Sequence, residues 1–328
     1  MRRREIIGLL GGAAATWPLT VRAQQAERVR RVSVLLGAGA DDTLSRSRLV
    51  AFEQALQQLG WIQGRNAQID YRWASGDAGN FRKHAAEMVA LAPDVLVAVG
   101  AGLGPLLQAT RTVPIVFVFA ADPVGSGFID SMSRPGGNAT GFMLFSFSLN
   151  AQWLQLLKEV APSISRAAVL RDPVVSAGVG QFAVIQSVAD SIGVEVSPIN
   201  PRDAGEIERG IVALARAGGG GLIVTATALA NVHRDLIVGL AARHRLPSIF
   251  YERSFVERGG LISYGTKLVD QYRLAAGYVD RILRGEKPAN MPAQAPTKYE
   301  LVINLKTAKT IGITVPESVL ARADEVIE

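Results

Sequence analysis

The sequence predicts an α/β protein built from two doubly wound lobes, and three observations lead to this fold class. The apolar strands are short and continuous, a pattern typical of parallel sheets that are covered by helices on both faces. Amphipathic helices separate these strands along the chain. The strand and helix series occurs twice, and 328 residues suffice for two domains of ordinary size.

The first series alternates strands and helices up to a turn-rich segment near residues 134–138. The first helix carries Leu49, Phe52 and Leu56 on one face, and Gly60 ends it. A second helix is expected around 80–91 and a short one before the fourth strand. The strands are expected at 32–36, 67–73, 94–99 and 115–119.

The second series follows the segment 142–149, where we expect the boundary between the two lobes along the chain. A helix at 268–283 comes after its last strand. Further turn residues lie from Gly285 to Pro296. The strands are expected at 167–170, 194–197, 222–224, 248–251 and 261–264.

The N-terminus has the pattern of an export signal. Three arginines at 2–4 precede an apolar run at 6–15, and a small-residue cleavage site ends at Ala23. The arginines resemble a twin-arginine signal, while a general secretory signal or an uncleaved anchor are the alternatives. We therefore expect residues 1–23 to be removed and the mature protein to be periplasmic.

Much of the positive charge belongs to this leader. The chain has 35 basic and 29 acidic residues, and cleavage after Ala23 takes away four arginines and one glutamate. The mature chain then carries 31 basic and 28 acidic residues, a balance of +3. Net charge therefore gives no reason to expect a nucleic-acid partner.

The absence of cysteine from the sequence excludes several classes of site. A disulfide scaffold, cysteine-bound zinc, an iron–sulfur cluster and a cysteine nucleophile all require a thiol. A lipid-modified N-terminal cysteine is excluded for the same reason. The mature protein is expected to diffuse freely, as a monomer.

Motifs for catalysis or cofactor binding are not found. There is no P-loop, no Gly-x-Ser-x-Gly elbow and no pair of histidines at metal-ligand spacing. Asp122, Asp172 and Glu252 each follow an apolar strand and are candidate acids or bases, although such residues more often cap a helix. We expect no cofactor, no metal and no catalysis, and an exported α/β enzyme is kept as the alternative.

The carboxyl ends of the predicted strands supply the candidate binding residues, because ligands of open parallel sheets bind there. Small residues let a ligand approach backbone amides, hydroxyls hold a carboxylate, and aromatic rings supply apolar walls. The alternative is that they cap helices and fill the core between the lobes. The candidates are Ala38, Gly100, Ala101, Ala121, Asp122, Phe142, Ser146, Asp172, Thr225, Ala226, Thr227, Tyr251, Glu252 and Tyr264.

The chain resembles, from end to end, the substrate-binding components of bacterial ABC importers, in the family that includes tryptophan-type binding proteins. The leader Arg2–Ala13 is common there, and the tail from Pro296 to Lys309 is the most distinctive stretch. The other stretches that carry the resemblance are 60–66, 114–117, 122–124, 134–141 and 259–265.

This resemblance implies a type I periplasmic-binding fold, with two Rossmann-like lobes, a hinge of three crossovers and a cleft between the lobes. It places lobe 1 at 30–143 plus about 255–286, and lobe 2 at 144–254 plus about 287–328. The cleft is expected to capture an amino acid, an aromatic compound or another small organic acid by closing, and to deliver it to an ABC permease. Asp122 or Glu252 would pair with a ligand ammonium group. A ligand-sensing module that uses the same cleft is a further alternative.

Overall fold

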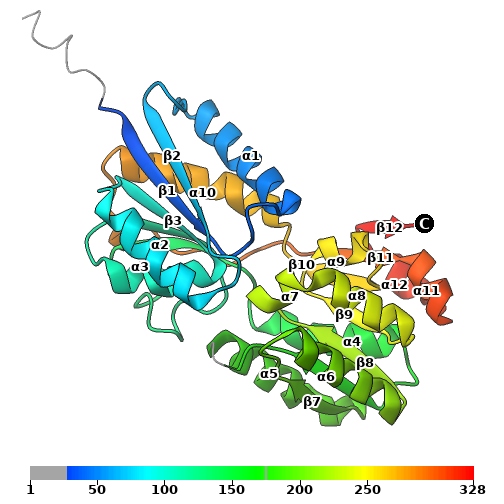
Figure 1. The fold of residues 1–328 in the computed structure, drawn as a ribbon. Coiled ribbons are helices and arrows are strands. Elements are labelled where there is room, and N and C mark those ends of the chain that lie inside the picture. Colours follow the sequence, from blue (N-terminus) through cyan, green and yellow to red (C-terminus); the bar gives the residue numbers. More distant parts are fainter. Residues whose placement is uncertain (1–27, 174–175) are drawn as a thin grey trace, which may run out of the picture.

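The computed structural model describes residues 28–173 and 176–328, and the export signal expected at 1–23 lies outside this part. The chain forms two lobes, each built around its own sheet (Figure 1). This arrangement confirms the predicted α/β class with two wound lobes. None of the helices in the described part of the chain is long and apolar enough to cross a membrane.

The first lobe contains a five-stranded parallel sheet in the order β2-β1-β3-β4-β5. Its strands are β1 (Arg30–Leu36), β2 (Ala67–Trp73), β3 (Val95–Val99), β4 (Ile115–Ala120) and β5 (Ala139–Met143). Its helices are α1 (Thr43–Gln58), α2 (Ala78–Ala90), α3 (Leu103–Ala109) and α10 (Leu268–Leu283), with short 3-10 turns at Gly100–Gly102 and Pro288–Asn290.

Alternate residues of these strands enter two separate cores. Val34 and Val97 face α1 and α10, whereas Leu35 and Leu96 face α2 and α3. Both faces of the sheet are therefore covered, which explains why the strands read as continuous apolar runs in the sequence.

The second lobe contains a seven-stranded sheet in the order β12-β11-β10-β9-β8-β6-β7. Its strands are β6 (Arg166–Leu170), β7 (Glu195–Ile199), β8 (Gly220–Val224), β9 (Ser248–Phe250), β10 (Ile262–Gly265), β11 (Glu300–Asn304) and β12 (Glu325–Ile327). Strand β11 runs antiparallel to β10 and parallel to β12. The sequence patterns did not predict β5, β11 or β12.

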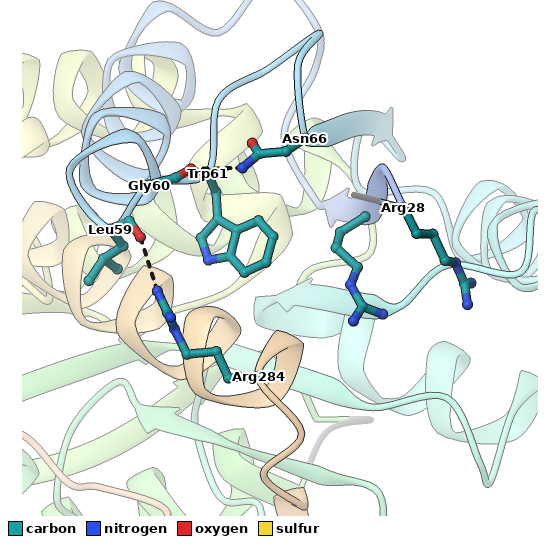
Figure 2. A pocket seen from close by; sticks show the side chains of 7 residues that line it. Arg28, Leu59, Gly60, Trp61, Asn66 and Arg284 are labelled. Carbon is teal, nitrogen blue, oxygen red and sulfur yellow. Dashed lines mark hydrogen bonds between the residues drawn. The ribbon is translucent and has the colours of Figure 1, made fainter. Parts of the chain in front are cut away.

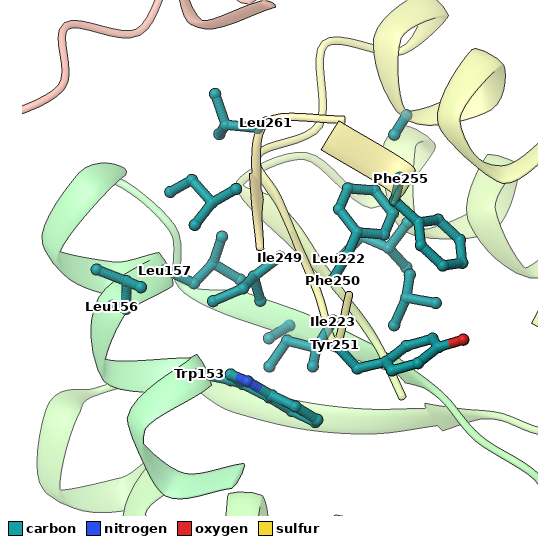
Figure 3. Close-up of a cluster of buried hydrophobic side chains, with 14 of the residues drawn as sticks. Trp153, Leu156, Leu157, Leu222, Ile223, Ile249, Phe250, Tyr251, Phe255 and Leu261 are labelled. Atoms are coloured by element: carbon teal, nitrogen blue, oxygen red, sulfur yellow. The ribbon is translucent and has the colours of Figure 1, made fainter. Parts of the chain in front are cut away.

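Helices cover both faces of the second sheet as well. They are α4 (Ser148–Val160), α5 (Ser176–Ala189), α6 (Ala204–Ala217), α7 (Ala228–Val232), α8 (Arg234–Arg243), α9 (Arg253–Glu257), α11 (Leu305–Ile311) and α12 (Glu317–Leu320), with a 3-10 turn at Asp190–Ile192. Trp153 and Leu157 of α4 lie beside Ile223 and Ile249 in the core of this lobe (Figure 3).

The expected boundary of lobe 1 at about 255–286 is wrong in its first part. Strand β10 pairs with β9 and β11, so it belongs to the second sheet, and only α10 from that segment packs on the first. The expected start of the last lobe 2 segment at about 287 is also too early. Ala293 still packs in the first lobe, and Gln294 exchanges backbone hydrogen bonds with Gly141 and Met143. An apolar run does not encode its pairing partner, which is why the boundaries were misplaced.

The chain crosses between the lobes at about 143–148, 265–268 and 294–300. Side chains join the first two crossovers: Thr266 Oγ1 donates to the carbonyl of Leu144 at 2.5 Å, and Gln271 Nε2 donates to that of Met143 at 2.7 Å. At Gly265 a Cβ atom would lie 1.9 Å from the carbonyl oxygen of Tyr251, so this position requires glycine. These contacts connect the first two crossovers.

Candidate functional site

Two ion pairs connect the lobes where the carboxyl ends of their strands face each other. Arg48 of α1 pairs with Glu252, which follows β9. Arg234, the first residue of α8, lies 3.4 Å (Nη2 to Oδ1) from Asp42, which precedes α1. We call these four side chains the seam cluster. Figure 1 shows that the start of α1 lies toward α7 and α9 of the second lobe.

Local structure fixes the first-lobe half of the seam cluster. Asp42 is the N-cap of α1, and its Oδ2 accepts hydrogen bonds from the amide of Ser45 at 3.0 Å and from its hydroxyl at 2.6 Å. Burial raises the pKa of Asp42, but these bonds and the charges of Arg234 and Arg48 outweigh it, so that the pKa is lowered. Asp42 therefore stays ionised beside the two arginines.

The second-lobe half is held by the neighbouring strand and helices. Glu252 is only 3% exposed, and Arg234 is 7% exposed. The hydroxyl of Tyr251 donates to Oδ1 of Asn231, and its ring packs edge-on against Phe255 at a centroid distance of 5.6 Å. Burial raises the pKa of Tyr251, so its hydroxyl remains protonated at neutral pH.

Aromatic rings border the seam cluster on the first-lobe side. Tyr272 of α10 is buried, and burial raises its pKa to about 12 even though Arg48 opposes the shift. Phe119 packs edge-on against Tyr272 with ring centroids 5.3 Å apart, and it contacts the cores of both lobes. Its φ of 65° at a β-bulge is a strained conformation for a bulky residue, and such strain is often found at functional sites.

A smaller polar group lies at the crossovers. The Tyr299 hydroxyl accepts from the amide of Ser146 and donates to its hydroxyl, both at 3.0 Å, and Ser146 also lies 2.8 Å from the Ser148 hydroxyl. The rings of Tyr264 and Tyr299 lie 5.9 Å apart. Of the predicted residues, Ser146 and Tyr264 thus meet at the hinge, whereas Tyr251 and Glu252 meet at the seam cluster.

Four other predicted residues have structural roles inside one lobe. The hydroxyl of Thr225 donates to the Leu170 carbonyl, that of Thr227 caps α7, and the carboxylate of Asp122 accepts from the amide of Gly125. Phe142 lies in the first-lobe core against Tyr278, with its ring 4.7 Å away, which argues against ligand contact. These positions agree with the capping and core-filling alternative.

The remaining predicted residues end their strands without joining the seam cluster. Ala121 and Ala226 pack against the second-lobe core, and Ala101 is exposed. Ala38, Gly100 and Asp172 are half-buried. The sequence patterns did not identify Arg48, Arg234 and Tyr272. The candidates were taken from the ends of the predicted strands, whereas these three side chains come from helices.

A hollow of about 340 Å³ lies elsewhere on the first lobe (Figure 2). It is bordered by Arg28 and Arg30 at the start of β1, by residues between α1 and β2, and by Arg284 after α10, at the amino ends of the strands. Its basic groups already have partners: Arg30 pairs with Asp94 at 2.9 Å, and Arg284 pairs with Asp280 at 2.6 Å. Because ligands of parallel sheets bind at the carboxyl ends, we do not place the binding site here.

The described ranges 28–173 and 176–328 contain no group of three or more His, Cys, Asp or Glu side chains placed to hold a metal ion. What the seam cluster offers instead is two cations and two anions, contributed by both lobes and largely shielded from water. Such groups recognise a ligand by charge and hydrogen bonding.

Comparison with known proteins gives both relatives and structures of the same shape. The tyrosine-binding protein of Clostridioides difficile is 23% identical over 266 residues, which are 80% of this chain and 75% of that protein. A conserved domain protein from Vibrio cholerae is 27% identical and superimposes with a TM-score of 0.83, over 91% of this chain and 100% of that one. An L-Trp complex of an ABC domain from Streptococcus pneumoniae, 23% identical, gives a TM-score of 0.81 over 91% and 99% of the two chains.

The fold is therefore that of the periplasmic binding proteins, as the sequence resemblance implied. The sequence profile of the family described as ABC transporter substrate binding protein matches residues 42–327, almost the whole described chain. Members of this family bind solutes and are not enzymes. The chain belongs to the ABC transporter substrate binding protein family.

Proposed function

We propose that this protein captures an amino acid between its lobes, outside the cytoplasmic membrane, and delivers it to an ABC permease. The observation that carries the proposal is the seam cluster, in which each lobe contributes one cation and one anion. A zwitterionic ligand has one group of each sign, so it adds no net charge to this buried site. The relatives named for tyrosine and tryptophan support this ligand class.

Aromatic side chains favour an amino acid with a large apolar side chain. Tyr251 and Tyr272 lie near the seam cluster, and Arg48 interacts electrostatically with both. Phe119 stands beside Tyr272. Flat rings of this kind bury an aromatic ligand efficiently and offer it edge-to-face contacts. Tyrosine, tryptophan and phenylalanine are the first ligands to test.

Lobe closure supplies the physical mechanism. A ligand that touches both lobes stabilises the closed arrangement, because its contacts are complete only when the lobes meet. The fold superimposes with a TM-score of 0.81 on the L-Trp complex and of 0.66 on the ligand-free, open structure of a substrate binding protein from Clostridium difficile, at nearly equal identity. This difference supports a closed arrangement of the lobes here. The permease would then recognise the closed surface.

The test is calorimetry on protein that has been unfolded, dialysed and refolded to remove carried-over ligand. The panel contains the three aromatic amino acids, aliphatic amino acids and small organic acids without an amino group. We expect one-to-one binding of an amino acid and a rise in the melting temperature that grows with ligand concentration. Tight binding of an acid without an amino group, with no amino acid bound, would contradict the proposal.

Delivery to a permease needs a separate measurement. The mature protein is added to vesicles that contain the candidate permease, and ATP-dependent uptake of the radiolabelled ligand is followed. We expect uptake to require the binding protein. Equal uptake without it would remove the transport role and leave the binding role intact. Sedimentation in the same preparation tests the expected monomer.

A further inference from the structure

We infer that Arg234 is the residue that holds the ligand carboxylate, an inference that rests on the proposed amino-acid ligand and assigns one of its contacts. The side chain is more than nine-tenths buried. Its Nε and Nη1 atoms are shielded from solvent and have no hydrogen-bond partner in the described part of the chain. A buried arginine is ordinarily paired at most of its donors, so this one has unused binding capacity.

The two contacts that Arg234 does make are long. Nη2 lies 3.4 Å from Oδ1 of Asp42 and 3.4 Å from the carbonyl of Asn231, near the limit for a hydrogen bond. Asp42 directs its other oxygen to Ser45, as the cap of α1. The carboxylate across the seam therefore satisfies only one side of the guanidinium.

Arg48 provides an internal comparison. Both arginines lie at the seam and both face a carboxylate of the opposite lobe, but Arg48 pairs closely with the buried Glu252. None of the nitrogens of Arg48 is among the buried atoms without a partner. Of the two cations, Arg234 is thus the one with buried donors that have no partner among the described residues.

The geometry of the guanidinium selects the ligand group. Its planar set of five N–H donors matches a carboxylate and can bind both oxygens at once. The ring of Phe255, with its centroid 5.9 Å from Cζ of Arg234, helps to hold the plane in place. Glu252 and Asp42 then remain as anions for the ligand ammonium group. The ligand class is an α-amino acid with a free carboxylate.

The experiment compares each free amino acid with its methyl ester, which keeps the ammonium group and loses the negative charge. L-Tyrosine and L-tryptophan are titrated calorimetrically against the wild type, together with their methyl esters. We expect the wild type to bind a free amino acid at least 100-fold more tightly than its ester.

Two variants and a control locate this preference. Arg234→Gln should weaken binding of the free acid at least 30-fold, leave the ester nearly unchanged and bring the two within about threefold. Arg234→Lys keeps the charge without the planar fork, and an intermediate ratio is expected. Arg243→Gln, at the exposed end of the same helix, should keep the wild-type ratio. Circular dichroism and melting temperature verify folding, and Arg234→Lys carries the test if Arg234→Gln does not fold.

The outcomes separate the two proposals. An unchanged preference for the free acid in Arg234→Gln, or in Arg234→Lys if only that variant folds, overturns the role of Arg234 and leaves the proposed function standing. Equal binding of acid and ester by the wild type also overturns only this inference. If the wild type binds neither tyrosine nor tryptophan but binds another amino acid of the calorimetry panel, the same comparison is made with that amino acid and its methyl ester. If it binds no amino acid at all, both proposals fail.

Discussion

The interior of the second lobe and the seam between the lobes are both buried, but they are built from opposite chemistry. Trp153, Ile223 and Phe250 are fully buried among apolar neighbours that belong to the same lobe. The seam instead buries Arg234 and Glu252, whose partners belong to the other lobe. In the proposed lobe motion the apolar contacts would persist in both arrangements, whereas the charges of the seam would return to water when the lobes part. We therefore expect the interior contacts to stabilise each lobe and the seam contacts to control how far the lobes separate.

The largest expected effect on stability comes from a cavity in the interior of the second lobe. Trp153→Ala removes a fully buried ring and the hydrogen bond from its Nε1 to the Tyr264 carbonyl at 2.7 Å. We expect a loss of about 3–5 kcal/mol in the free energy of unfolding, measured with urea. Leu274→Ala, at a side chain that is 51% exposed, should stay within about 0.5 kcal/mol of the wild type. If both substitutions changed the free energy of unfolding by a similar amount, the packing of α4 would not contribute to the stability of the core.

A smaller effect on stability is expected at the seam. Glu252→Gln leaves Arg48 without its anion, a change that costs about 3–5 kcal/mol in a rigid interior. Because separated lobes expose Arg48 to water, we expect a loss below about 2 kcal/mol and a larger radius of gyration in X-ray scattering.

The matched control is Glu159→Gln, which removes a surface partner of Arg322. It should change neither the radius of gyration nor, beyond about 1 kcal/mol, the stability. The result against this expectation is that Glu252→Gln lowers the free energy of unfolding by about 3–5 kcal/mol and leaves the radius of gyration unchanged. That result would mean that the lobes do not separate.

The smallest expected effect is the pH dependence at Asp42. Its pKa is lowered in the folded protein, since hydrogen bonds from Ser45 and the nearby arginines outweigh the effect of burial. A lowered folded pKa gives stability that is present above the unfolded pKa and is lost as the pH falls through the folded value. Asp42→Asn retains a capping side chain, so we expect it to lower the free energy of unfolding by less than about 1 kcal/mol at pH 6. The loss should be smaller still at pH 3, where part of the stabilisation by the ionised carboxylate is already gone in the wild type. Melting temperatures of both proteins at the two pH values check this, and a difference that stays constant with pH would contradict it.

The sequence predicted the two-lobed fold well because its signals are local. Apolar strands such as 115–119 and the helix 268–283 are visible as short patterns, and the structure has elements at these positions. The antiparallel strand β11 was missed as a strand, although the family resemblance included its residues. Its place depends on pairing with β10, which lies more than thirty residues earlier.

The site was predicted less well, for a related reason. Tyr251 and Glu252 follow a strand directly, so the rule for strand ends found them. Arg48 lies in a helix, 204 residues away from Glu252, and its role depends on how the lobes meet. No local pattern contains that information. From the sequence alone, a basic residue on the face of a helix is indistinguishable from an ordinary solvent-exposed residue. Only the position of the opposite lobe shows that it is buried.

The way the chain returns to each lobe also constrains its synthesis. The first sheet ends with β5, yet its α10 cover is translated only after most of the second lobe, and β11 and β12 come last of all. A nascent chain therefore carries a first sheet that lacks its α10 cover until Leu283, and a second sheet that stays unfinished until β12. A chain cut short before Leu268 would have all five strands of the first sheet without its α10 cover, and a second sheet without β11 and β12, so neither lobe would be complete.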